Sequence, residues 1–231
     1  LETIKTEIIL SDLDVIQKKL EKNKKKFLEP KEIKILDEKL KDLSEGKEVK
    51  ISNFEEEKFL SSIGLLSIKP KIIVCNVDEE NLGKGNDYTD QVKKKYPNEK
   101  IINICADIED QLSGLDKSEK EIFMQDIGLN KTGLNKLIKE GYDLLMLDTF
   151  FTSGPEESRA WTIEKNSKAA DAAGVIHTDF KKKFIRAETV THEDFIKYKG
   201  FNECKNAGKL RLEGKDYSVN DGDVMYFRVG S

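Results

Sequence analysis

The chain has 231 residues, enough for one large domain or two smaller ones. Its 40 basic and 44 acidic residues leave a net charge of −4, which excludes a global attraction to nucleic acid or acidic membranes and leaves only a local patch as a source of one. No apolar run approaches the length of a membrane span, and the three cysteines are too few and too scattered for a disulfide framework, which fits a reducing cytoplasm.

The first residues, Leu1-Glu2-Thr3, show neither a methionine nor a signal-peptide pattern, which suggests a fragment of a longer protein. Up to Gly46 the apolar residues recur every three or four positions in two runs separated by Pro30. This spacing predicts two helices packed as a hairpin, with Gly46 as a C-cap. The lysines at positions 22 and 24–26 lie toward its tip, where they form either a solvated face or a contact with RNA phosphates.

A helix is predicted over 54–66, and the apolar run from Ile72 to Val74 predicts a buried strand of a parallel sheet. The residues after it are polar, and open α/β sheets place ligands at that end of a strand. A helix over 88–96 and a second strand over 101–106 complete a right-handed βαβ unit. Because two strands do not make a stable open sheet, we expect further strands from elsewhere in the intact protein.

Two more helices are predicted over 118–127, with Ser118 and Glu121 as a capping box, and over 132–147. After Asp148 the pattern changes to short strands and turns. It predicts a hairpin (150–152 and 159–163), a small helix (168–174), a strand (184–190), a helix (191–198) and three short strands (210–212, 217–219 and 224–229). A mixed sheet of short strands around one small helix is a β-grasp arrangement.

The spacing Asn76-x-x-Glu79 fits the base-recognition motif of P-loop GTPases and their relatives, and it follows a buried strand as that motif does. In the guanine-specific version the last residue is Asp, so Glu79, one methylene longer, puts guanine recognition in doubt. The alternative is a strand-to-loop turn in which Asn and Asp are chosen for their turn chemistry.

Three longer segments carry a resemblance to a known family: Asn76-Val77-Asp78-Glu79, Arg159-Ala160-Trp161-Thr162-Ile163, and the run from Ala172 to Phe180. Together with Glu213 to Val224 they closely resemble the YchF/Obg-like ATPases over nearly the whole chain. The resemblance implies an α/β fold in three parts: a helical hairpin (1–58), the second half of a P-loop G domain with a parallel sheet (59–147), and a C-terminal β-grasp TGS domain (148–231).

The resemblance also implies residue roles. Asn76, Val77 and Glu79 fall on the family's base-reading motif, in which Glu goes with a preference for ATP over GTP, and Cys105 and Ala106 fall on a second loop whose backbone amides approach the base. Guanine offers two donors to a carboxylate, whereas adenine presents an acceptor that a carboxylate repels. No Gly-x-x-x-x-Gly-Lys-[Ser/Thr] loop occurs in the chain, so we expect the phosphate-binding residues and the ligands of Mg²⁺ to lie outside it, and this chain alone to be inactive.

The basic cluster Lys181, Lys182 and Lys183, predicted on a loop, is a candidate RNA or ribosome contact together with Arg186 and His177; a solvated turn is the alternative. His177 has no recognisable nucleophile or metal partner, so we expect a structural or RNA-contact role for it. The sequence therefore predicts part of a cytoplasmic, ribosome-associated ATPase, with no membrane or specific DNA partner. The alternative is a non-catalytic RNA- or ribosome-binding module made of the hairpin and the TGS domain.

Overall fold

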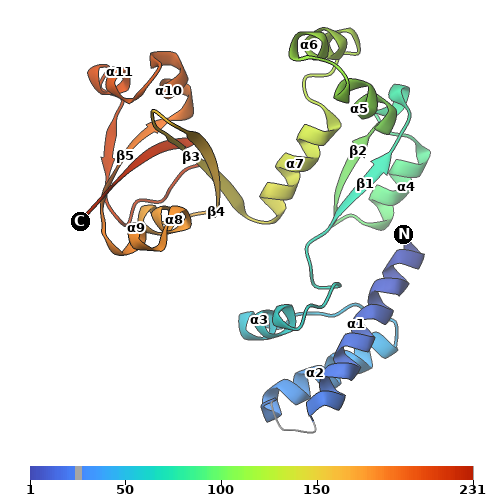
Figure 1. Cartoon of the computed structure of the whole chain (residues 1–231). Coiled ribbons are helices and arrows are strands. Elements are labelled where there is room, and N and C mark those ends of the chain that lie inside the picture. The colour runs from blue at the N-terminus through green and yellow to red at the C-terminus, as the bar shows by residue number, and fades with distance from the viewer. Residues whose placement is uncertain (24–27, 231) are drawn as a thin grey trace. The chain divides into compact units, whose positions relative to one another are not determined.

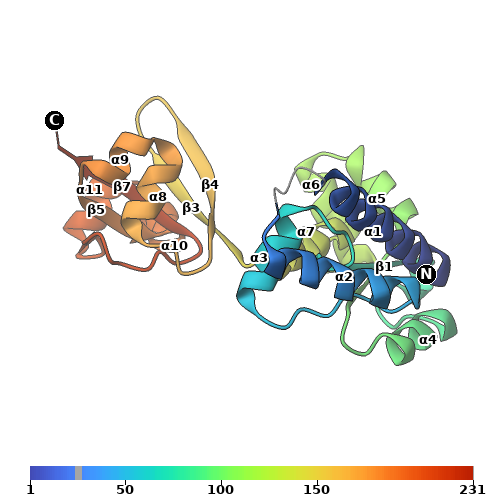
Figure 2. The same ribbon diagram turned by 90° about the horizontal axis from the view of Figure 1, so that it is seen from below.

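A computed structural model describes residues 1–23 and 28–230 (Figure 1). The chain divides into two compact units, Leu1–Lys71 and Ile72–Ser231, and each is described by itself. Figure 2 shows the helices and strands of the same ribbon from below. Within the described ranges, no helix combines the length and the apolar character needed to cross a membrane.

The first unit contains the two predicted helices, α1 (Glu2–Lys22) and α2 (Pro30–Ser44), which pack against each other, and a third helix, α3 (Phe54–Ser62). Pro30 occupies the first turn of α2, where its missing N–H costs nothing. At the other end, Gly46 has φ +73°; its N–H bonds to Leu43 O and the next N–H, of Lys47, bonds to Asp42 O. These two bonds form a Schellman motif, so the predicted C-cap is confirmed. Of the predicted tip lysines, 24–26 lie outside the described residues.

The apolar stripes of α1 and α2 form the core of this unit, in which Ile16, Leu36 and Leu43 are almost fully buried. Asp12, on α1, is also fully buried, and its carboxylate accepts hydrogen bonds from the N–H groups of Leu66 and Ser67, at 2.7 and 2.8 Å. A charged acceptor for two amides, it fixes the segment after α3 against α1.

A buried ion pair makes a second long-range connection in this unit. Lys39 Nζ lies 2.5 Å from Glu56 Oε1, with both side chains only 7% exposed, and Lys39 also donates to the Lys50 carbonyl. Burial works to raise the pKa of Glu56, but the adjacent Lys39 ammonium and hydrogen bonds from Ser52 together outweigh it and hold that pKa below its usual value.

The second unit begins with the predicted βαβ arrangement. Strands β1 (Ile72–Asn76) and β2 (Lys100–Ile104) are parallel and in register from Ile72–Lys100 to Asn76–Ile104, and α4 (Asp87–Lys95) connects them. Three helices follow: α5 (Ala106–Ser113), α6 (Lys117–Asp126) and α7 (Gly133–Leu144).

Two features of this region differ from the predictions. The sequence reasoning missed α5, whose short apolar pair, Ile108 and Leu112, is buried four residues apart. It also placed the capping box of α6 two residues too late. The N-cap is Asp116, which accepts from the Glu119 N–H while Glu119 accepts from the Asp116 N–H. Ser118 instead donates to the Asp116 carboxylate, because it lies inside the first turn.

The rest of the chain forms a mixed five-stranded sheet with the strand order β4-β3-β7-β5-β6. Its strands are β3 (Leu147–Ser153), β4 (Ser158–Glu164), β5 (Phe184–Thr191), β6 (Arg211–Glu213) and β7 (Asp223–Val229). Neighbours are antiparallel except β3 and β7, which are parallel. The helices are α8 (Ala169–Ile176), α9 (Thr178–Lys182), α10 (His192–Tyr198) and α11 (Phe201–Asn206).

The structure confirms a mixed sheet of short strands with a small helix packed on it, and it corrects the predicted elements in three places. The predicted strand over 217–219 is not a strand; it makes only one isolated bridge, between Ser218 and Lys168. The short helix α11 was not predicted. The segment after Phe180 is not a loop, because Lys181 and Lys182 belong to α9 and Lys183 caps it.

Residue alternation gives this sheet two different faces. Ala187, Met225 and Phe227 point to the first face, where α8 packs over a core that also includes Phe150 and Ile163. Val190 and Val224 point to the second face and pack with side chains of α10 and α11. These two helices cover one end of the second face (Figure 1).

Candidate nucleotide-base site and basic surfaces

Asn76 stands at the carboxyl end of β1 and connects it to the helix that follows β2. Its amide oxygen accepts a hydrogen bond from the Ala106 N–H at 3.0 Å. Ala106 is the first residue of α5, so this N–H has no partner within its helix. One residue further, the Val77 N–H donates to the Ile104 carbonyl at 2.8 Å and extends the parallel ladder. The predicted base-site residues Asn76, Val77 and Ala106 are therefore brought together at the carboxyl-terminal edge of the two parallel strands, β1 and β2.

Val77 and Cys105 are buried, and their side chains pack in the core next to this edge. Both belong to an apolar cluster with Leu82, Ile108 and Leu112. The Cys105 thiol is thus part of the core, as expected for a small apolar side chain, and only its backbone is placed to contribute to the edge.

Glu79 begins a short 3₁₀ helix, η2 (Glu79–Asn81), just after β1. Its side chain is exposed and makes no hydrogen bond or ion pair with another residue in the described ranges. Asp78 and Glu80, on either side, are exposed as well. The carboxylate is consequently available to an external partner, and the local field is negative.

Three residues that the sequence reasoning missed shape the surroundings of this edge. The Glu109 carboxylate accepts from the Gly133 N–H at 2.5 Å, and a Cβ on Gly133 would lie 2.9 Å from both that carboxylate and an Ile104 methyl group. Gly133 therefore lets α7 begin directly against β2. Asn103, on β2, has a buried amide oxygen with no hydrogen-bond partner among the described residues. The signal available in the sequence was Asn103 itself, a polar residue inside an otherwise apolar strand.

The predicted RNA-contact residues are not one cluster. Lys181 forms an ion pair with Asp171 at 2.5 Å, and its aliphatic stem lies over Gly174. His177 is the N-cap of α9: its Nδ1 accepts from the Asp179 N–H at 3.2 Å, which is a structural role. Lys182 and Lys183 are exposed and make no ion pair with another described residue.

Arg186 lies apart from these lysines. It is paired with Arg228 across β5 and β7, and the residue after it, Ala187, points into the core beneath α8. Alternation therefore places the Arg186 side chain on the second face of the sheet, opposite to α8 and the α9 helix that follows it. The structure separates the predicted set into Lys182 and Lys183 on one side and Arg186 on the other.

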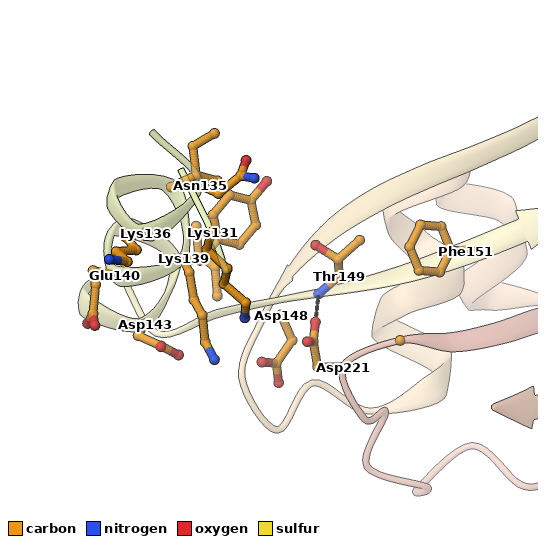
Figure 3. Close-up of a pocket in the computed structure, with 14 residues that line it drawn as sticks. Lys131, Asn135, Lys136, Lys139, Glu140, Asp143, Asp148, Thr149, Phe151 and Asp221 are labelled. Atoms are coloured by element: carbon orange, nitrogen blue, oxygen red, sulfur yellow. Dashed lines mark hydrogen bonds between the residues drawn. The ribbon is translucent and has the colours of Figure 1, made fainter. Parts of the chain in front are cut away.

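A cleft of about 800 Å³ lies between α7 and the start of β3, with charged residues on both walls (Figure 3). Basic side chains of Lys131, Lys136 and Lys139 line one wall, and Asp148 and Asp221 line the other. Burial, and then the neighbouring Asp221, raise the pKa of Asp148. Asp221 also accepts from the Thr149 N–H at 2.8 Å. No local pattern predicts this cleft, because residues as far apart in the chain as Lys131 and Asp221 form its two walls.

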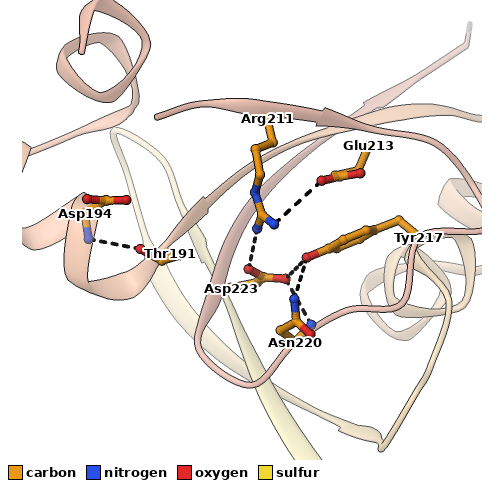
Figure 4. A network of polar contacts seen from close by, with 7 residues as sticks. All are labelled: Thr191, Asp194, Arg211, Glu213, Tyr217, Asn220 and Asp223. Carbon is orange, nitrogen blue, oxygen red and sulfur yellow. Dashed lines mark hydrogen bonds and ion pairs between the residues drawn. The ribbon is translucent and has the colours of Figure 1, made fainter. Parts of the chain in front are cut away.

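A buried polar network ties the β6–β7 connection to the sheet (Figure 4). Asp223, nearly inaccessible, accepts from Arg211 Nη2 at 2.9 Å, from the Tyr217 hydroxyl at 2.8 Å and from the Asn220 N–H at 3.0 Å. Burial and the Asp223 carboxylate raise the pKa of Tyr217 to about 12. All donors to Asp223 come from within 12 residues of it, so the network is a local anchor of this connection.

The fold and this polar edge define the class: a mixed α/β protein with one parallel and one mixed sheet, whose polar residues gather where parallel-stranded proteins bind ligands. Residues 147–230 match the family model YchF-GTPase_C, described as a protein of unknown function (DUF933).

Relatives match over almost the whole chain. The "Ribosome-binding ATPase YchF" of Haemophilus influenzae is 41% identical over 99% of the chain, and that of Bacillus subtilis is 38% identical over 99%. A solved structure, the Schizosaccharomyces pombe YchF GTPase, is 31% identical over 99% of the chain with a TM-score of 0.80. These matches show that almost the whole chain is homologous to the YchF proteins.

The chain spans 65% of the length of each of these three relatives. A GTP-binding protein from Pyrococcus horikoshii OT3 is similar in fold alone, with 17% identity, a TM-score of 0.57 and coverage of 99% of this chain and 70% of that one.

Proposed function

We propose that this chain supplies the base-binding edge and the ribosome- or RNA-binding surfaces of a cytoplasmic P-loop ATPase. The observation that carries the proposal is the bond from the Ala106 N–H to Asn76, which holds the ends of β1 and β2 together beside the exposed Glu79. Asn76, Val77, Glu79, Cys105 and Ala106 would border the base. In this assignment 1–58 is the helical hairpin, 59–147 the second half of the G domain and 148–231 the TGS domain.

We infer that the base is adenine, because Glu79 stands where the guanine-specific motif has Asp. The side chain of Glu79 is one methylene longer, so its carboxylate would not lie against the two donors of guanine as that Asp does. The Ala106 N–H is already engaged by Asn76, so Asn76 would act by orienting the loop, and its NH₂ group would face the base. Mg²⁺ and the triphosphate would be held by residues outside this chain, since its sequence has no phosphate-binding loop.

The relatives' names differ on the nucleotide, because the bacterial proteins are called ATPases and the fission-yeast structure is called a GTPase. A direct test is competition binding of ATP and GTP to the whole protein and to its Glu79→Asp variant, with Glu80→Asp as the matched control. We expect the parent to prefer ATP and Glu79→Asp to shift the ratio toward GTP, because each charge-assisted bond to guanine contributes about 1.5–3 kcal/mol. An unchanged ratio would mean that the backbone, not Glu79, selects the base.

The proposal also expects this chain by itself to release no phosphate from Mg²⁺-ATP or Mg²⁺-GTP, because most of the electrostatic stabilisation of the transition state is missing. The assay is phosphate release from the purified chain, with a mock preparation as the control. Magnesium-dependent turnover above that control would contradict the assignment of the phosphate site to other residues.

The second candidate function is a binding module without catalysis, and the free cations Lys182 and Lys183 favour it. Each contact between a lysine and a phosphate should add roughly 0.7–0.9 to the salt dependence of binding. Ribosome co-sedimentation of the chain across a salt series, with the double change Lys182→Glu and Lys183→Glu, measures this contribution. If the folded variant sediments like the parent at every salt concentration, these lysines are only a solvated surface.

A further inference from the structure

The second face of the five-stranded sheet is open beyond α10 and α11. We call this region the open face and define it by Arg186, Glu188, Leu212, Tyr226 and Arg228. Glu188 is opposite both Tyr226 and Leu212 in the neighbouring strands, and Arg186 is opposite Arg228, so these five side chains share one face on β5, β6 and β7. Tyr226 is 43% exposed and Leu212 59%, and both arginines are exposed.

The arrangement of charges on this face lowers the stability of the sheet. Two arginines placed directly opposite each other on adjacent strands repel and destabilise a sheet. Glu188 accepts from Arg228 Nε at 3.0 Å and compensates one of them. Arg186 has no ion-pair partner among the residues that the structure describes. An anion bound beside Arg186 would remove the remaining repulsion.

An aromatic group lies beside this charge. The Arg228 guanidinium lies over the Tyr226 ring, 4.5 Å from its centroid, and Phe201 of α11 makes a T-shaped contact with that ring, with ring centroids 6.4 Å apart. The guanidinium is thereby positioned by both the ring and Glu188. A guanidinium on an aromatic ring, next to a cation without an ion-pair partner among the described residues, matches what an unstacked base and its phosphate require.

We propose that the open face binds a single-stranded RNA segment, with a base stacked on the Arg228–Tyr226 pair and a phosphate held by Arg186. This proposal rests on the RNA- or ribosome-binding role proposed above and gives it a location. That location is opposite to the side of α8 and α9, so it is distinct from the contact attributed to Lys182 and Lys183. Leu212 would contribute an apolar contact to the base or the ribose.

The test is fluorescence anisotropy of a labelled single-stranded oligonucleotide RNA with the 231-residue chain across a salt series. Because stacking of one base on an aromatic side chain contributes about 1–3 kcal/mol, Tyr226→Ala should weaken binding by roughly 5- to 150-fold. Tyr226→Phe keeps the ring and should bind like the parent. Arg186→Ala should weaken binding and reduce the salt slope by roughly 0.7, the contribution of one phosphate on a single strand.

Lys215→Ala is the matched control, because it removes one exposed cation whose backbone carbonyl bonds to Ala170 of α8, on the other face of the sheet. Circular dichroism and thermal unfolding of each variant show that the fold is retained. If Lys215→Ala weakens binding as much as Arg186→Ala while Tyr226→Ala has no effect, the open face is not the site, although RNA binding itself stands. If the parent chain binds no RNA even at low salt, the proposed RNA-binding role fails first.

Two further competitors identify the occupant. Unlabelled double-stranded RNA should compete poorly, since a paired base cannot reach the Arg228–Tyr226 stack. Polyglutamate of equal charge should also compete poorly, because it offers no base. Competition by either one as effective as by single-stranded RNA would overturn the proposal in favour of a duplex or an acidic protein segment.

Discussion

Asp223 allows the clearest quantitative test of how the C-terminal sheet is held together. Its carboxylate is almost fully buried and accepts from Arg211, Tyr217 and the Asn220 backbone. In Asp223→Asn one oxygen acceptor remains and the other becomes an NH₂ donor. Either Arg211 or the Tyr217 hydroxyl then faces a donor, and every remaining bond loses the assistance of the negative charge.

The magnitude follows from the exposure of the partners. Arg211 is 41% exposed and lies 3.8 Å from Glu213, so it can turn to water, and the loss of its ion pair should cost at most about 1 kcal/mol. A hydrogen bond to a charged group contributes about 1.5–3 kcal/mol and a neutral one about 0.5–1.5, so weakening the Tyr217 and Asn220 bonds costs about 1–2 kcal/mol more. The total is about 2–3 kcal/mol. This lowers the Tm by about 10–20 °C when residues 147–230 unfold as one small domain.

Trp161 gives a selective assay, because it is the single tryptophan of the chain and packs against the core of this sheet. Urea unfolding followed by its fluorescence should show the lower stability of Asp223→Asn. Asp216→Asn, in an exposed carboxylate of the same connection, is the matched control and should leave the midpoint unchanged. A variant within about 0.5 kcal/mol of the parent would refute the view that Asp223 organises the connection, since surface changes commonly fall in that range.

The same network predicts a pH dependence. Because the folded-state pKa of Tyr217 is raised to about 12, the folded protein holds this proton more tightly than the unfolded chain does. Its contribution to stability is therefore complete below the ordinary pKa of about 10 and is lost as the pH rises from there toward 12. In a phenolate absorbance titration one tyrosine should ionise late, and in Asp223→Asn it should ionise earlier, with the part of the shift due to burial remaining.

Three further changes test other features. Asn76→Ala leaves the Ala106 N–H without its acceptor and should weaken nucleotide binding by the whole protein, by about 1 kcal/mol or severalfold, in a calorimetric titration; equal affinity would show that the bond is not used. Asp12→Ala removes the acceptor of two amides in the first unit and should lower its stability by about 2–4 kcal/mol, seen as faster hydrogen exchange at 66 and 67, whereas unchanged exchange would rule out this anchor. Since the pKa of Glu56 is depressed, its contribution is present above the unfolded value of about 4.5 and is lost as the pH falls below it; Glu56→Gln should flatten that acid dependence of unfolding.

Local sequence signals predicted most of the elements, because their causes lie within a few residues. The stripes of α1 and α2, Pro30 in a first turn, and Gly46 with its positive φ each depend on neighbours three to five positions away. The apolar run before Asn76 likewise predicted β1 and its polar end, although not its exposure, since Val74 is 40% exposed in the structure. The misses were short elements such as α5 and α11, in which one or two apolar contacts decide and periodicity has no room to show.

The sequence by itself predicted the candidate base-site residues as a motif, and it determined the parallel βαβ unit and the family resemblance, since these are patterns along the chain. Only the tertiary structure decided what those residues contact: that Asn76 holds Ala106, that Lys181 is neutralised by Asp171, and that Arg186 lies opposite Arg228 on the other side of the sheet from the lysines. The physical reason is that charge pairing and the choice of face depend on strand register and on partners dozens of residues away, and neither is encoded in local spacing.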